Sequence, residues 1–98
     1  MVDFIPFIRD YLSRLTRSKE KDYIPNFAYR SYARWAVYEL MAYVLDRWND
    51  GVHIETSIME FIEKMNKYSL SDKPGSYMFS VAYDVACSIS DEFVMRYF

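Results

Sequence analysis

The stretch NFAYRSYARWAVYELMAYVLDRWN, residues 26–49, decides the fold because its hydrophobic residues form two stripes at helical spacing. One stripe follows the pattern i, i+4, i+7, i+8, i+11, i+15 and consists of Ala33, Val37, Leu40, Met41, Val44 and Trp48. The second stripe lies on roughly the opposite side and consists of Ser31, Trp35, Tyr38, Ala42, Leu45 and Asn49. A helix that is apolar on two faces is usually buried on both. We therefore expect a central helix with neighbours on both sides in its own chain, or one whose second face meets another chain.

Three other stretches carry hydrophobic residues at the spacing of a helix face. They lie at about residues 3–17, 54–70 and 76–96. Two glycines and three prolines are too few for the turns of a many-stranded β fold, and they fall mainly in the breaks between the predicted helices, as Pro25, Gly51 and Pro74 do. The sequence thus predicts an all-α fold, with residues 1–98 forming a single compact domain of about four helices. An antiparallel bundle and an orthogonal helical array both fit this pattern.

The third predicted helix carries its own charge pattern. Glu60 and Lys64 are spaced i, i+4 in the favoured orientation, and so are Glu63 and Lys67. We expect this face to lie in solvent. Ser57 followed by Glu60 resembles a capping box, unless both residues lie inside the first turn.

Few side chains are suited to catalysis or metal binding. The chain has one histidine, His53, and one cysteine, Cys87, whereas zinc and di-iron sites on helices draw on several His or Cys ligands. Cys87 lies one turn from Asp84 and Asp91, whose negative charge opposes a thiolate. The two aspartates are about 10 Å apart along one helix, slightly too far for an acid–base pair. We expect no enzymatic activity, no metal and no cofactor, with His53 as a polar residue at a helix entrance.

The aromatic content is the most unusual part of the composition. Ten Tyr, seven Phe and two Trp are more than a core of 98 residues can easily enclose, and Tyr, Trp and Arg are enriched at interface hot spots. The alternative interpretation is a core rim with Tyr hydroxyls in water and Arg stems over the rings. The predicted partner-binding residues are Tyr29, Arg30, Tyr32, Arg34, Trp35, Tyr38, Tyr97 and Phe98. We expect a small non-enzymatic helical protein, of an accessory, regulatory or inhibitor type, that acts through protein–protein contacts and associates with itself.

A second interpretation is a nucleic-acid-associated regulator. Residues 1–34 carry seven basic and four acidic side chains, a net +3, whereas residues 35–98 carry five basic and ten acidic, a net −5. The basic segment 9–21 could contact phosphates through Arg9, Arg14, Arg17, Lys19 and Lys21. Acidic residues interrupt this segment and the whole chain has a net charge of −2, so a solvated helix end and linker is the simpler expectation.

The cysteine content and the hydropathy pattern bear on the cellular compartment. A single cysteine permits no disulfide within the chain, which favours a reducing environment. No run of about 18 uncharged apolar residues occurs, and Asp3, Arg9 and Asp10 disrupt any signal-peptide pattern. We therefore expect a cytoplasmic protein that does not enter the membrane.

Overall fold

The computed structural model describes residues 3–17, 27–70 and 75–97 of the chain. These residues form four helices and no strand: α1 (Phe4–Arg17), α2 (Phe27–Asn49), α3 (Ile54–Ser69) and α4 (Ser76–Tyr97). Each boundary lies within one residue of the position expected from hydrophobic spacing. The all-α prediction is confirmed.

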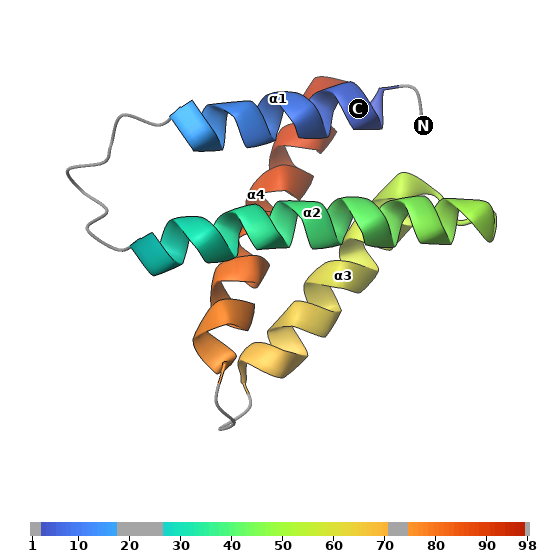
Figure 1. Cartoon of the computed structure of the whole chain (residues 1–98). Helices are drawn as coiled ribbons and strands as arrows, with labels where there is room; N and C mark the ends of the chain where they lie inside the picture. Colours follow the sequence, from blue (N-terminus) through green and yellow to red (C-terminus); the bar gives the residue numbers. More distant parts are fainter. Residues whose placement is uncertain (1–2, 18–26, 71–74, 98) are drawn as a thin grey trace.

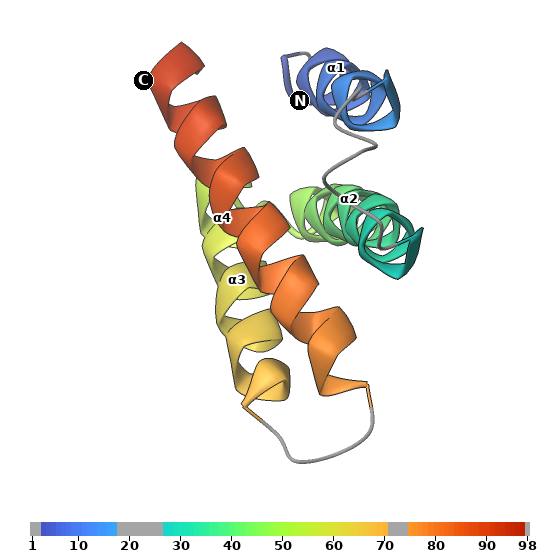
Figure 2. The same cartoon turned by 90° about the vertical axis from the view of Figure 1, so that its left-hand side faces the viewer.

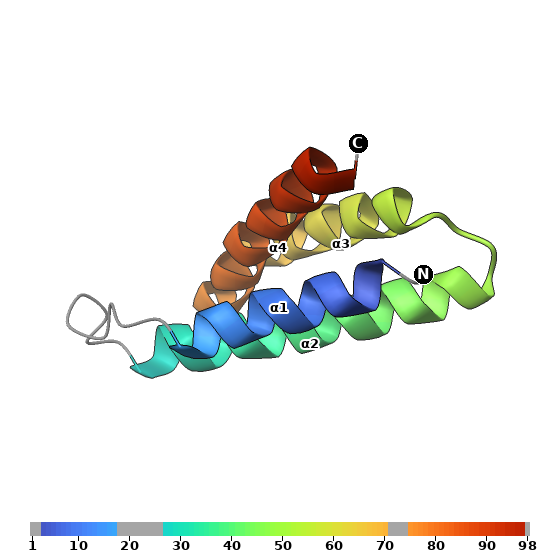
Figure 3. The same ribbon diagram turned by 90° about the horizontal axis from the view of Figure 1, so that it is seen from above.

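The four helices form two antiparallel pairs, one laid across the other (Figure 1). Helices α1 and α2 run side by side in opposite directions, as seen from above in Figure 3. Helices α3 and α4 form the second pair, and Figure 2, which looks along α1 and α2, shows α3 and α4 running across that view. Contacts are most extensive between α3 and α4, followed by α2 and α4. The arrangement is therefore two antiparallel helical pairs that cross and pack around one core.

The turn after α2 sets the direction of α3. Gly51 has a φ of 81°, in the left-handed region that glycine adopts without steric cost. Its N–H donates to the Trp48 carbonyl at 3.0 Å, and the Val52 N–H donates to the Arg47 carbonyl at 3.1 Å. These bonds satisfy carbonyls at the helix end, as in the usual glycine helix stop. The predicted end of the helix at Gly51 is confirmed.

The core is filled by one stripe from each helix. Among the side chains that the structure describes, eighteen hydrophobic ones are buried: Phe4, Phe7, Ile8, Ala33, Ala36, Val37, Leu40, Val44, Ile58, Phe61, Ile62, Met65, Val81, Ala82, Val85, Ala86, Ile89 and Phe93. The first predicted stripe of α2 contributes Ala33, Val37, Leu40 and Val44 to this core, while Met41 is half-buried and Trp48 is exposed. Burial of these side chains is the main driving force that holds the two helical pairs together.

The second stripe of α2 is largely uncovered. Tyr38, Ala42 and Leu45 are exposed, and Trp35 is only half-buried. Helix α2 is nonetheless central in the fold, with α1 on one side and α3 and α4 on the other, so the first of the two expectations is met, although the described residues leave the second stripe partly exposed. The outer face of α2, which we define as Tyr38, Ala42 and Leu45, stays in contact with solvent.

An aromatic cluster joins the two ends of the chain. The Phe93 ring lies edge-on to Phe4 at 5.8 Å and to Phe7 at 5.3 Å between ring centroids. Tyr97 packs on Phe93 at 4.9 Å and on Phe7 at 6.2 Å. Edge-to-face pairs of this kind stabilise beyond their buried area. Helix α1 is therefore fixed to the C-terminal turns of α4 as well as to α2.

One expectation for α3 is corrected, and the alternative left open for Ser57, a position inside the first turn, is the one observed. Glu60 faces Arg47 of α2, with Arg47 Nε 3.1 Å from Glu60 Oε1, instead of pairing with Lys64 in solvent. Lys64 instead lies over the Tyr43 ring. Ser57 is fully buried inside the helix, which begins at Ile54 with His53 as its N-cap residue, so it does not cap the helix. Glu60 thus binds Arg47 of α2 instead of forming the i, i+4 ion pair with Lys64 within α3.

Candidate functional site

A groove of about 400 Å³ lies between α1 and α2. We call it the apolar groove, and its lining residues are Ile5, Ile8, Arg9, Leu12, Val37, Tyr38, Met41 and Leu45. The α2 wall follows helical spacing from Val37 through Tyr38 and Met41 to Leu45, and the opposite wall is one face of α1. Among the described residues that line it, Arg9 alone is charged. The groove is therefore suited to apolar contact.

Large side chains at this edge of α2 remain accessible to water. Tyr38 keeps 48% of its surface exposed, Trp48 keeps 42% and Leu45 keeps 36%. Single exposed apolar residues are common on protein surfaces, but a contiguous group beside an apolar groove is typical of an interaction surface. This group continues the apolar groove onto the outer face of α2.

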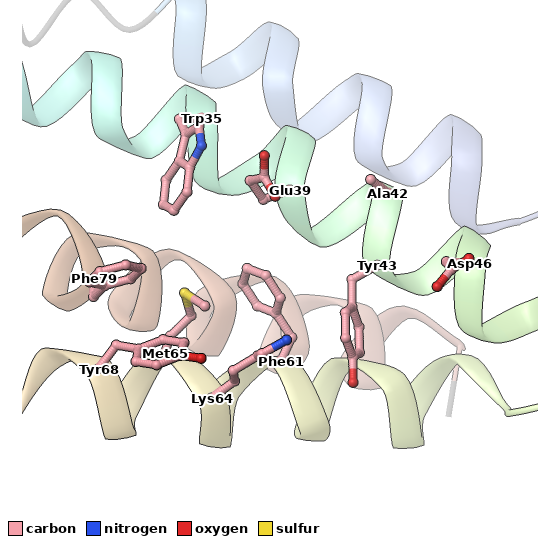
Figure 4. Close-up of a pocket in the computed structure, with 10 residues that line it drawn as sticks. All are labelled: Trp35, Glu39, Ala42, Tyr43, Asp46, Phe61, Lys64, Met65, Tyr68 and Phe79. Atoms are coloured by element: carbon pink, nitrogen blue, oxygen red, sulfur yellow. The ribbon is translucent and has the colours of Figure 1, made fainter.

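A second groove, of about 490 Å³, lies on the other flank of α2, where it faces α3 and the start of α4 (Figure 4). We call it the aromatic groove, and its lining residues are Trp35, Glu39, Ala42, Tyr43, Asp46, Phe61, Lys64, Met65, Tyr68 and Phe79. Figure 4 shows Trp35 and Tyr43 extending from α2 toward α3. Five of the ten lining residues are aromatic, so ring faces and edges dominate its walls.

The rings of the aromatic groove contact one another across three helices. Phe79 lies edge-on to Trp35 at 6.1 Å and packs against Tyr68 at 5.0 Å. Tyr43 packs against Phe61 at 6.0 Å. Phe61 and Met65 are buried and connect the groove to the core. These contacts hold the rings against one another within the chain.

Charged groups surround the Tyr43 ring. Arg47 binds Glu60 through two N–H donors, Nε to Oε1 at 3.1 Å and Nη2 to Oε2 at 3.3 Å, and the Tyr43 hydroxyl donates to the same Oε1 at 3.3 Å. The Lys64 ammonium lies 5.5 Å from the centre of the Tyr43 ring, which is cation–π distance. Glu39 and Asp46 form the acidic part of the α2 wall and are both exposed.

Two tyrosines of α2 have a raised pKa. Burial is the largest cause for Tyr43, followed by the negative charge of Glu60. Burial also comes first for Tyr29, followed by the negative charge of Asp84 on α4. Both causes disfavour the phenolate. The two hydroxyls therefore stay protonated at neutral pH, and Tyr43 presents a neutral ring beside Lys64.

The structure divides the predicted partner-binding residues among different surroundings. Tyr29 is half-buried against the core, Tyr32 lies edge-on to Tyr77 at 5.8 Å, and Trp35 belongs to the aromatic groove. Arg30 is half-buried and Arg34 is exposed. Tyr38 lines the apolar groove. Tyr97 lies at the far end of α4, and Phe98 is outside the described residues. The predicted set thus does not form one continuous surface.

The basic segment is partly engaged in ion pairs. The Arg14 guanidinium bonds Asp10 through Nε at 3.1 Å and also bonds Glu92 of α4 through Nη2. Arg9 is exposed at the apolar groove. The Arg17 side chain, Lys19 and Lys21 lie outside the described side chains. The nucleic-acid hypothesis remains an untested prediction, with one of its arginines already paired to two carboxylates.

The remaining polar candidates lie apart from both grooves. His53 is exposed at the start of α3, as expected for a polar helix entrance. Cys87 is half-buried on α4, and a hydrogen bond with Cys87 is the largest cause that raises the pKa of Tyr83. Within residues 3–17, 27–70 and 75–97, no three His, Cys, Asp or Glu side chains are grouped to hold a metal ion. In the same part of the chain, no helix is both long and apolar enough to cross a membrane.

Sequence reasoning did not identify the aromatic groove as a unit. On α2, Trp35, Glu39, Tyr43 and Asp46 share one helix face, and this spacing could have been read from the sequence. Tyr68 and Phe79 belong to α3 and α4, and only the crossing of the helical pairs brings them beside Trp35. Comparison of the chain with protein-family models, with curated proteins and with solved structures gave no significant match.

Proposed function

We propose that this protein is a non-enzymatic helical interaction protein that associates with a second copy of itself through the outer face of α2 and the apolar groove. The observation that carries this proposal is the exposure of Tyr38 and Leu45 on a helix of 23 residues, about 34 Å long. Removing apolar surface of this kind from water is the main driving force for protein association.

The side chains on the outer face of α2 can form a self-complementary interface between two copies. A two-fold interface pairs residue i of one copy with residue j of the other, and residue j with residue i. In an antiparallel pair of α2 helices, Tyr38 of each copy can pack on Leu45 of the other. Met41 and Ala42 then lie near the two-fold axis, and the small Ala42 side chain allows the helices to approach closely. The same few residues would supply both halves of the interface.

The charge distribution along α2 favours the antiparallel orientation. Its first half carries Arg30 and Arg34, whereas its second half carries Glu39 and Asp46 together with Arg47, which is already paired with Glu60 and Asp50. Antiparallel pairing brings the basic half of one copy near the acidic half of the other, and parallel pairing brings like charges together. Complementary potentials of this kind orient association more than they strengthen it.

Leu45→Glu tests the proposal by placing a charge in the interface. We expect wild-type protein to form a dimer at micromolar concentrations in sedimentation equilibrium and light scattering. Leu45→Glu should weaken the dimer by about 30-fold or more, since an unpaired buried charge costs at least about 2 kcal/mol. Leu45 is exposed in the single chain, so the variant should fold as the wild type does.

Met59→Glu is the matched control. Met59 is also a large exposed apolar residue, at 51%, but it lies on α3 and lines neither groove. The same charge at this position should leave the dimer unchanged. A wild-type protein that stays monomeric at high micromolar concentration, or equal weakening by both variants, would refute self-association through α2.

A further inference from the structure

We propose that the aromatic groove binds an arginine side chain presented by a basic segment of another protein. This site lies on the opposite flank of α2 from the apolar groove, although Ala42 and Asp46 belong both to it and to the surface proposed for self-association. The proposal rests on three features of the groove: ring faces, two carboxylates and a cation that the chain itself already places there.

The rings supply the first feature. A cation within about 6 Å of the face of a Trp or Tyr ring is attracted by its quadrupole, and arginine uses this contact more often than lysine does. Trp35, Tyr43 and Tyr68 offer such rings from two different helices. Phe61 and Met65 are buried below them and form an apolar base. The groove volume of about 490 Å³ is within the usual range of ligand pockets.

The carboxylates supply the second feature. Glu39 and Asp46 are exposed on the α2 wall, two helical turns or about 10 Å apart, and neither forms an ion pair with another described residue. With Lys64, the lining charges sum to −2 + 1, or −1. A planar guanidinium can stack on a ring and bind a carboxylate through two N–H donors at once, which an ammonium cannot do.

Lys64 supplies the third feature. Its ammonium lies 5.5 Å from the Tyr43 ring centre, so a positive charge already rests against this groove. Next to it, Glu60 holds the Arg47 guanidinium at 3.1 and 3.3 Å beside the same tyrosine. The chain therefore provides, within itself, the contacts that an incoming arginine would make. Lys64 is exposed and long, and it can turn away into water when a guanidinium replaces it.

A titration with a defined peptide tests the proposal. The probe is a capped glycine–arginine peptide with two arginines, and its control is the same peptide with citrulline, which has the shape of arginine without its charge. Binding is followed by the backbone amide shifts of isotopically labelled protein. We expect saturable shifts around Trp35, Tyr43 and Tyr68 with the arginine peptide and none with the citrulline peptide.

Removing the acidic residues of the groove and removing Lys64 should change the affinity for the arginine peptide in opposite directions. Glu39→Gln combined with Asp46→Asn should weaken the arginine peptide about fivefold, as expected for two exposed ion pairs. Lys64→Gln should strengthen binding about twofold, because the competing cation is removed. The matched control is Glu63→Gln with Asp91→Asn, which changes the net charge equally at exposed positions outside the groove and should have little effect.

Three results would overturn the proposal: no saturable shifts with the arginine peptide, equal binding of the citrulline peptide, or equal weakening by the two double variants. Repeating the titration with Leu45→Glu separates this site from self-association. We expect the arginine peptide to bind that variant at least as well as the wild type, because the dimer interface would cover Ala42 beside the groove, so either proposal can fail without the other.

Discussion

The two grooves beside α2 both include aromatic side chains of this helix but differ in how those rings are held. In the aromatic groove, Trp35 and Tyr43 contact rings from α3 and α4, and Phe61 below them is only 4% exposed. In the apolar groove, Tyr38 keeps 48% of its surface in water. One helix thus carries rings that pack against other helices on one flank and a tyrosine that stays half exposed on the other.

The crossing of the two helical pairs explains the difference. The α3–α4 pair lies across α2 and covers the flank that carries Tyr43, so rings from three helices meet there (Figures 2 and 4). On the other flank, α1 is the one helix of the described residues that lies beside α2. α1 is a shorter helix of 14 residues, and it leaves a groove beside it. The number of neighbouring helices, not the residue type, decides which rings are buried.

The largest expected difference between the two flanks is in stability. Phe61→Ala should lower the free energy of unfolding by about 3–5 kcal/mol, because it leaves a cavity where the ring meets the core. Tyr38→Ala should lower it by less than about 1 kcal/mol, since its ring is already half in water. Chemical denaturation measures both. Phe61→Leu, which keeps most of the volume, should cost only about 1 kcal/mol, and equal costs for Phe61→Ala and Tyr38→Ala would contradict the comparison.

Hydrophobic spacing predicted the helices well because each helix buries one regular stripe. Ala33, Val37, Leu40 and Val44 follow the 3.6-residue period and are all in the core. Gly51 ended α2 as expected, since its φ of 81° suits few other residues. The end of a helix depends on residues that are neighbours in the sequence, and the buried stripe depends on which face of the helix points toward the core. Both can be read from a single sequence.

The candidate sites were harder to predict because they depend on how helices cross. The sequence indicated an aromatic surplus near Tyr29 to Tyr38, but it could not show that Tyr32 would meet Tyr77 while Tyr38 would stay exposed. The pairing of Glu60 was wrong for the same reason. Its local partner was Lys64, but α2 brings Arg47 within 3.1 Å, and a guanidinium with two donors is the stronger partner.

The two tryptophans of α2 allow a smaller, matched comparison. Trp35→Ala should lower the free energy of unfolding by about 2–3 kcal/mol, because the half-buried ring packs on Phe79 at 6.1 Å. Trp48→Ala should cost about 1 kcal/mol or less, since Trp48 is 42% exposed and forms no recorded ring contact with the described residues. Thermal denaturation measures both losses of stability. A larger loss for Trp48→Ala than for Trp35→Ala would show that Trp35 is not held by the aromatic groove.

The smallest expected effect is a pH dependence on the Tyr43 side of α2. Burial, and then Glu60, raise the pKa of Tyr43 above the ordinary tyrosine value of about 10. A group whose pKa is higher in the folded state adds stability that is complete below the unfolded value and is lost as the pH rises through the folded value. Wild-type protein should therefore lose stability in the alkaline range, and Tyr43→Phe should lose less over the same range. Urea denaturation at neutral and alkaline pH measures the difference, and an unchanged alkaline loss in Tyr43→Phe would mean that the environment of Tyr43 does not favour its neutral form.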